Sequence, residues 1–147
     1  MGYTLQAIVG NAEILSPVTG DLPTVRLPQN QILIPLTTDV RSVAGQIPFL
    51  PFTDEGYDVV PDSLAALCKS LSRLGRIVYL EAEFHGGTGI QAMLIAEHGN
   101  LVRGPVVDDE AISAALRSIG VVTNGARDEF EAIHLGGHRD TDDWLQT

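Results

Sequence analysis

One stretch of the sequence decides the fold: residues 77–103 read IVYLEAEFHGGTGIQAMLIAEHGNLVR. Its first eight residues place an apolar side chain at every second position, which is typical of a β-strand with one face on a core. The glycines at 86–89 predict a turn into a second apolar strand, and residues 97–100 predict a tight turn into a third. Consecutive strands joined by short turns pair antiparallel, so the stretch predicts a meander from about 77 to 104.

Two main helices are expected, one before the meander in the sequence and one after it. Residues 62–74 carry leucines at helical spacing, and Gly75 is expected to end this helix in the left-handed conformation. Residues 108–119 carry a second apolar stripe, with the Asp108 side chain as the expected N-terminal cap. A shorter C-terminal helix is expected from about 128 to 135.

The first third of the chain adds β-forming segments rich in proline. Residues 3–9 and 31–36 predict two strands, and Pro35 places the second at a sheet edge or a bulge because proline cannot donate a ladder hydrogen bond. Residues 47–52 contain two prolines and are expected to lay two aromatic rings over the core as an irregular covering segment. At 147 residues the chain is long enough to bury a real core. The sequence therefore predicts a single α+β domain over 1–147, with a mostly antiparallel sheet packed by helices.

The charge balance favours some partners over others. Nineteen Asp and Glu stand against nine Lys and Arg, which gives a net charge of −10. Such a surface repels phosphate backbones, so direct binding of nucleic acid is not expected. It would instead speed the encounter with a basic protein partner. The simpler interpretation is that the acidic charge serves solubility alone.

Cysteine usage and hydropathy indicate the compartment. Cys68 is the only cysteine, which excludes an intramolecular disulfide and a cysteine-rich zinc site. It lies on the apolar stripe of the first helix and is expected to be a buried packing thiol. The N-terminus has no signal-peptide pattern, and no apolar run reaches the roughly 18 residues needed to span a bilayer. The sequence predicts a cytoplasmic protein without membrane contact.

The first candidate site lies on the polar side of the first meander strand. A strand's period of two puts Glu81, Glu83 and His85 on one face, about 6.5 to 7 Å apart from one to the next. Two carboxylates and an imidazole can bind a divalent metal or act as an acid–base pair, with Gln91 on the returning strand as a further polar group. The alternative is an ordinary solvated sheet face. Spacing fixes no further ligand, so no metal, cofactor or catalytic residue is assigned.

The second candidate site is the C-terminal segment, where charges surround the single tryptophan. Its residues are Arg139, Asp140, Asp142, Asp143 and Trp144. Tryptophan and arginine are favoured anchors at protein interfaces, so the segment is a candidate binding surface. The alternative is a terminal segment pinned to the body by one aromatic ring.

Four parts of the chain carry a resemblance: residues 79–84, residues 86–91, the helix from Asp109 to Gly120, and the ending 137–144. Together they resemble a group of uncharacterised short bacterial proteins. The likeness covers most of the chain and is least distinctive in the first third. That group has no established activity, so the resemblance implies no catalytic residue. It is similar in style to the small acidic immunity partners of bacterial toxins.

Three hypotheses follow from the sequence. The leading one is an acidic binding protein, an immunity or antitoxin-like inhibitor that occludes a basic toxin such as a nuclease. It would use the glutamates of the strand face and the aspartates beside the tryptophan. The second is a small metal-dependent or ligand-binding enzyme centred on the strand face. The third is a structural, homo-oligomeric accessory protein whose polar sheet face is solvated.

Overall fold

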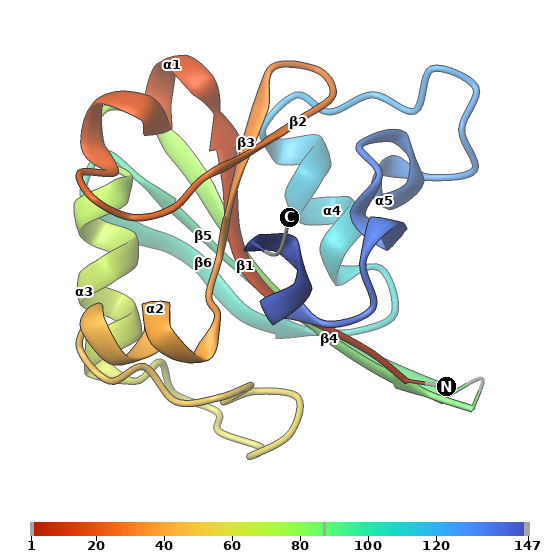
Figure 1. Ribbon diagram of the computed structural model, residues 1–147, viewed down its shortest axis with the longest axis horizontal. Helices are drawn as coiled ribbons and strands as arrows, with labels where there is room; N and C mark the ends of the chain where they lie inside the picture. Colours follow the sequence, from red (N-terminus) through yellow and green to blue (C-terminus); the bar gives the residue numbers. More distant parts are fainter. Residues whose placement is uncertain (1, 87, 146–147) are drawn as a thin grey trace.

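A six-stranded sheet in the order β2-β3-β1-β4-β5-β6 forms the centre of the protein, and every pairing in it is antiparallel (Figure 1). The computed structural model describes residues 2–86 and 88–145. The strands are β1 (Gly2–Asn11), β2 (Val25–Leu27), β3 (Gln31–Pro35), β4 (Arg76–His85), β5 (Thr88–Glu97) and β6 (Asn100–Val107). The α-helices are α1 (Ala12–Leu15), α2 (Thr38–Val43), α3 (Asp62–Leu71), α4 (Ala111–Ser118) and α5 (Glu129–Ala132). Short 3₁₀ turns complete the set: η1 (Ser16–Val18), η2 (Leu135–Gly137) and η3 (Thr141–Leu145).

The predicted meander is confirmed, and with it the α+β class. β4 pairs with β5 along its whole length, from Arg76 opposite Glu97 to His85 opposite Thr88. The next turn contains His98 and Gly99 with φ angles of 50° and 83°, the left-handed pair that a two-residue hairpin requires. β5 then pairs with β6 less regularly, with register shifts in the middle of the ladder.

Helices cover both faces of the sheet, as Figure 1 shows for α2 and α3 on one side and α4 and α5 on the other. Val78, Leu80 and Ala82 of β4 belong to the apolar cluster under α4 and α5. Ile77 and Tyr79, which point the other way, belong to the cluster under α2 and α3. The alternation in the sequence correctly predicts the orientation of the side chains. The second face, expected to be polar and open, is covered as well.

The helix expected at 62–74 is confirmed as α3, but it ends earlier than predicted and in a different way. α3 stops at Leu71, where the backbone N–H of Ser72 still donates to the carbonyl of Cys68. Gly75 does not adopt the expected left-handed conformation. It lies close to Ile14 instead, whose side-chain end would have to shift to make room for a Cβ atom at this position.

The helix expected at 108–119 begins later than predicted. Its first residue is Ala111, and Asp108 does not cap it but accepts a hydrogen bond from the N–H of Glu110 at 2.7 Å in the preceding turn. Gly120, with a φ of 92°, ends the helix as expected. The helix expected at 128–135 is interrupted after Ala132.

Pro35 avoids an unmade ladder hydrogen bond, as expected, but not because its strand lies at the sheet edge. β3 lies between β2 and β1, so the expected edge position is wrong. However, β2 pairs only with residues Gln31 to Leu33, and Pro35 extends past its end. The missing N–H of Pro35 therefore leaves no ladder bond unmade.

The segment between α2 and α3 covers the sheet with one aromatic ring rather than two. Phe52 is buried against Tyr79, whereas Phe49 is exposed and lies under the guanidinium of Arg41, 4.9 Å from the ring centroid. Cys68 lies on the buried face of α3, and burial raises the pKa of its thiol to about 12, which suits a packing role. In the part of the chain described, no helix has the length and apolar character to cross a membrane.

The C-terminal segment completes the edge of β1 where β3 does not reach. The N–H of Thr4 donates to the carbonyl of Arg139 at 2.7 Å, and the N–H of Gln6 donates to the hydroxyl of Thr141 at 3.0 Å. The same hydroxyl donates to the carbonyl of Thr4 at 3.2 Å. Thr141, rather than Trp144, is the main hydrogen-bonded tie of this segment.

We expect Thr141→Val, which keeps the side-chain shape, to lower the free energy of unfolding by about 1–3 kcal/mol. The buried N–H of Gln6 would lose its acceptor. Urea unfolding measures the loss. Thr24→Val, at an exposed threonine, is the matched control and should change stability by less than about 0.5 kcal/mol. Equal effects of the two substitutions would contradict the role given to Thr141.

Candidate functional site

The strand face chosen from the sequence divides into a buried part and an exposed part. Glu81, Glu83 and His85 do share one side of β4, but Glu81 is fully buried beneath the segment that follows α2. Its predicted place on an open, solvated face is therefore wrong. Glu83 and His85 lie at the exposed end, with side chains 22% and 66% accessible and 3.4 Å between Glu83 Oε2 and His85 Nε2.

The carboxylate of Glu81 is surrounded by hydrogen-bond donors. Its Oε2 accepts from the Thr53 hydroxyl at 2.6 Å, the Thr53 N–H at 2.7 Å and the Phe52 N–H at 3.2 Å. Its Oε1 accepts from the Tyr79 hydroxyl at 2.7 Å. Hydrogen bonds to an ionised acceptor are among the strongest in proteins, so this group fastens the covering segment to the sheet.

The network continues from Glu81 into β1. The side-chain amide of Gln6, also fully buried, donates to the Tyr79 hydroxyl at 3.0 Å and to the carbonyl of Pro48 at 3.0 Å. Burial raises the pKa of Glu81, and the hydrogen bonds from Thr53 and Tyr79 act in the opposite direction. Burial, reinforced by the adjacent Glu81 carboxylate, raises the pKa of Tyr79 as well.

This arrangement gives no support to metal binding at the strand face. Four donors converge on the Glu81 carboxylate, and their positive ends would repel a cation. Within residues 2–86 and 88–145, no three His, Cys, Asp or Glu side chains are placed to hold a metal ion.

Gln91 lies on the opposite face of the sheet from Glu81, so grouping them in one site is wrong. The register pairs Gln91 with Ala82, and directly opposed residues project to the same face. Gln91 Oε1 accepts a hydrogen bond of 3.0 Å from the N–H of Ile112 in the first turn of α4. Gln91 therefore caps a helix beside a pocket described below.

The C-terminal candidates are brought beside α2, a neighbour that the sequence did not reveal. Asp142 Oδ1 accepts from the N–H of Thr38 at 3.1 Å, and Asp140 Oδ1 accepts from the N–H of Asp142 at 3.2 Å. Partial burial lowers the pKa of the Arg41 guanidinium, and the nearby carboxylates of Asp142 and Asp140 oppose that shift. The two aspartates are thus exposed acids at the start of α2.

The other three C-terminal candidates, Trp144, Asp143 and Arg139, do not share the contact with α2. Trp144 is half-buried and meets the ring of His138 edge-on, with 4.6 Å between centroids. Asp143 is half-buried, and Arg139 is exposed although its carbonyl is bound to β1.

Among the described residues, the segment from α2 to the start of α3 carries several of the exposed large apolar side chains. Of the ten large apolar side chains that are exposed among the described residues, four lie between 43 and 59. They are Val43, Phe49, Tyr57 and Val59. Exposed acids lie among and beside them: Asp39, Asp54, Glu55, Asp58 and Asp62. We call these nine residues the acidic apolar surface.

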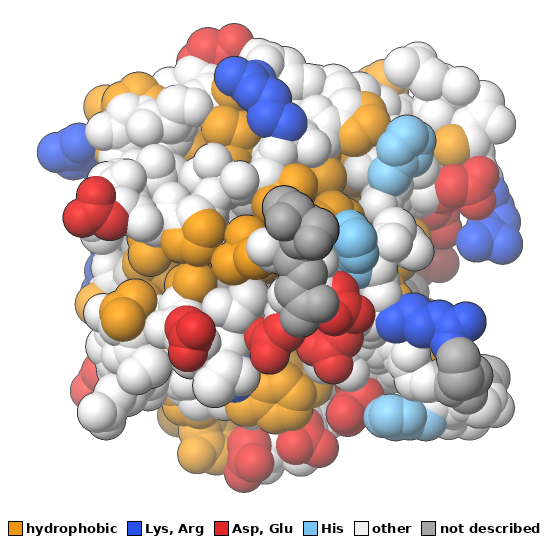
Figure 2. Space-filling view, viewed as in Figure 1, with side chains coloured by type: hydrophobic (Ala, Val, Ile, Leu, Met, Phe, Trp, Pro, Cys, Tyr) orange, Lys and Arg blue, Asp and Glu red, His pale blue; other side chains and the backbone are white. Residues whose placement is uncertain are grey.

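Figure 2 shows acidic side chains gathered in the lower part of the view, where the loop after α2 and the C-terminal segment lie. Asp140 and Asp142 border the acidic apolar surface through the contact with Thr38. A local excess of acids over residues 39–62 could have been read from the sequence. The exposure of the apolar side chains could not, because the same residues are equally suited to a core.

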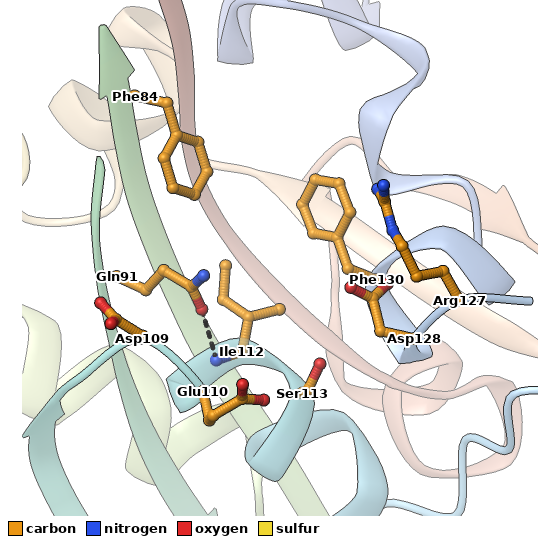
Figure 3. Close-up of a pocket in the computed structure, with 9 residues that line it drawn as sticks. All are labelled: Phe84, Gln91, Asp109, Glu110, Ile112, Ser113, Arg127, Asp128 and Phe130. Atoms are coloured by element: carbon orange, nitrogen blue, oxygen red, sulfur yellow. Dashed lines mark hydrogen bonds between the residues drawn. The ribbon is translucent and has the colours of Figure 1, made fainter. Parts of the chain in front are cut away.

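A pocket of about 290 Å³ opens on the other side of the sheet, between the β4–β5 hairpin and helices α4 and α5 (Figure 3). Its walls contain two phenyl rings, three carboxylates and a serine hydroxyl: Phe84, Phe130, Asp109, Glu110, Asp128 and Ser113. They come from three separate parts of the chain, and no spacing in the sequence connects them.

Nothing matches this chain in comparisons with protein-family models, with curated proteins and with solved structures. The two surfaces are therefore interpreted from their geometry.

We expect Glu81→Gln to lower the free energy of unfolding by about 1–3 kcal/mol, because an amide N–H₂ would face donors where a carboxylate oxygen now accepts. The covering segment should loosen first, seen as faster hydrogen exchange at the amides of Phe52 and Thr53. Glu83→Gln, two residues further on the same face, is the control and should change stability by less than about 0.5 kcal/mol. Unchanged exchange at both amides in the Glu81 variant would contradict the fastening role.

Proposed function

We propose that this protein binds a basic protein partner through the acidic apolar surface. The observation that carries the proposal is the mixture of exposed apolar and acidic side chains along one segment, with Val43 79% and Val59 70% accessible. Protein interfaces combine an apolar centre with a polar rim, and exposed apolar clusters mark such sites. The acidic rim makes a basic partner the complementary one.

The surface is held in place before a partner arrives. Glu81 and Gln6 bind the backbone of the covering segment from below, and Asp142 binds the start of α2 from the side. A surface ordered in advance loses less conformational entropy on association. Arg41, which lies over the ring of Phe49, is the one base among residues 39–62 and is outnumbered by five acids, so the rim is acidic overall.

An immunity or antitoxin-like inhibitor is the class of binding protein that fits this surface best. Nucleases bind phosphate backbones through basic surfaces. An acidic protein of net charge −10 that covered such a surface would exclude the nucleic acid. We accordingly place the protein in the bacterial cytoplasm, where a cell would need protection from a toxin of this kind.

One of the two edge strands, β6, gives little support to the alternative of a homo-oligomer. β6 carries Pro105, which has no N–H to donate, and its ladder with β5 is shifted in register. Both features disfavour the addition of another strand at this edge.

The proposal expects a basic domain to be encoded beside this protein's gene, and the test measures association with that domain, with lysozyme as a probe of charge alone. Removing three acids from the surface, by Asp54→Asn, Glu55→Gln and Asp58→Asn, should lower the association rate at low salt by about tenfold or more. Tyr57→Ala should mainly raise the dissociation rate. Stopped-flow or surface-binding kinetics separate the two effects.

The matched control removes three exposed acids elsewhere, by Glu13→Gln, Asp21→Asn and Glu131→Gln. It should lower the association rate by less than about threefold. Equal losses in both triple variants would mean that net charge alone acts, and would overturn the choice of surface. Failure of the neighbouring basic domain to bind, or binding no tighter than that of lysozyme, would overturn the proposed function.

A further inference from the structure

The pocket beside α4 and α5 is separated by the sheet from the acidic apolar surface and needs its own explanation. Its volume of about 290 Å³ suits a small ligand or a single long side chain. It lies on the face of the sheet that carries Ala82 and Gln91.

Two aromatic rings form opposite walls of the pocket. Phe84 comes from β4 and Phe130 from α5, and Figure 3 shows the two rings facing each other across the opening. Tyr3 packs against both, with centroid distances of 5.8 and 5.7 Å, and its hydroxyl donates to the carbonyl of Leu135 at 2.7 Å. The rings are therefore fixed, and their faces attract cations on apolar stems.

The charge of the lining is negative. Asp109 and Glu110 stand before α4, Asp128 stands at the start of α5, and none of the three forms an ion pair within the described ranges. Arg127, at the margin, lies 3.6 Å from Glu131 in an ion pair and is largely exposed.

An anion is not the ligand that this lining favours. The first two N–H groups of α4, which could attract one, are occupied, because Ala111 donates to the carbonyl of Asp108 and Ile112 donates to Gln91. The unpaired charges that remain are carboxylates.

A serine hydroxyl points into the same space. Ser113 is 8% exposed, its hydroxyl makes no hydrogen bond to any residue that the structure describes, and Figure 3 shows it directed into the pocket from α4. A serine hydroxyl can both donate and accept, so this oxygen is available to accept a hydrogen bond from a ligand.

We infer that this pocket binds an organic cation, an ammonium or guanidinium group on a short aliphatic stem. The stem lies between Phe84 and Phe130, and an N–H of the cation donates to the Ser113 hydroxyl. Asp128 and the carboxylates before α4 balance the charge. A free amine and a Lys or Arg side chain of a peptide share this chemistry. The inference does not depend on the proposed function, because it concerns the other face of the sheet.

The test titrates the full chain with n-butylguanidinium and n-butylammonium and follows binding by NMR. Both cations should shift the signals of Ser113 and the Gln91 side-chain amide in a saturable manner. Butanol, of the same shape without charge, should bind at least tenfold more weakly, and butyrate should not bind. Absence of saturable shifts at these residues with either cation would overturn the inference.

Asp128→Asn removes a charge and keeps the helix cap, because asparagine also accepts the hydrogen bond now made by the N–H of Glu131 at 2.9 Å. Combined with Glu110→Gln, it should weaken cation binding at least tenfold, and Phe130→Leu should weaken it severalfold. The control Asp54→Asn with Glu55→Gln removes two charges beyond the sheet and should change affinity less than twofold. Equal weakening by the control pair would show diffuse charge attraction and overturn the site.

Two further ligands distinguish the sources of the cation. An arginine-containing decapeptide that binds at least tenfold tighter than n-butylguanidinium, with the same shifts at Ser113, would identify a protein side chain as the occupant. Tighter binding of a free diamine such as putrescine would identify a small metabolite. A third outcome is that the butyl cations bind saturably, neither further ligand binds tighter, and the Asp128→Asn/Glu110→Gln variant binds them as well as the wild type does. This outcome would contradict both sources and the role of the carboxylates.

Discussion

Glu81 holds a fully buried carboxylate among four hydrogen-bond donors, and the covering of one sheet face depends on this arrangement. Taking a carboxylate out of water costs several kcal/mol unless donors converge on it. The backbone N–H groups of Phe52 and Thr53 would in turn lack partners without the carboxylate. Each side of the contact therefore requires the other. The irregular, proline-rich segment is held in one position although it has little regular structure of its own.

Local patterns in the sequence are sufficient to predict the meander, but they do not predict how the covering segment and the helices pack against it. Alternation along β4 predicts which side chains share a face, and the structure confirms it. Burial of Glu81 could not be predicted, because its partner Thr53 is 28 residues away and no local pattern connects them. The misplacement of Gln91 was avoidable: a hairpin that pairs His85 with Thr88 puts Gln91 opposite Ala82, away from Glu81. The pocket was beyond prediction, since it depends on how α4 and α5 pack.

The carboxylates of this acidic chain serve different purposes according to their surroundings. Glu81 and Asp142 are used within the fold, one beneath a loop and one at the start of a helix. The acids on the segment after α2 have apolar neighbours and solvent, which suits a large, basic partner. Those around the pocket have aromatic neighbours and an unpaired hydroxyl, which suits a small cationic group. Net charge alone, the strongest signal in the sequence, does not separate these uses.

The bond between Gln6 and Thr141 joins residues 135 positions apart. Contacts of such separation form late, because closing a long loop costs entropy before any contact repays it. During synthesis the edge of β1 stays unpaired beside residues 4 and 6 until residue 141 has left the ribosome. The order in which the chain emerges therefore leaves this part of the β1 edge exposed until the segment at 139–141 closes it.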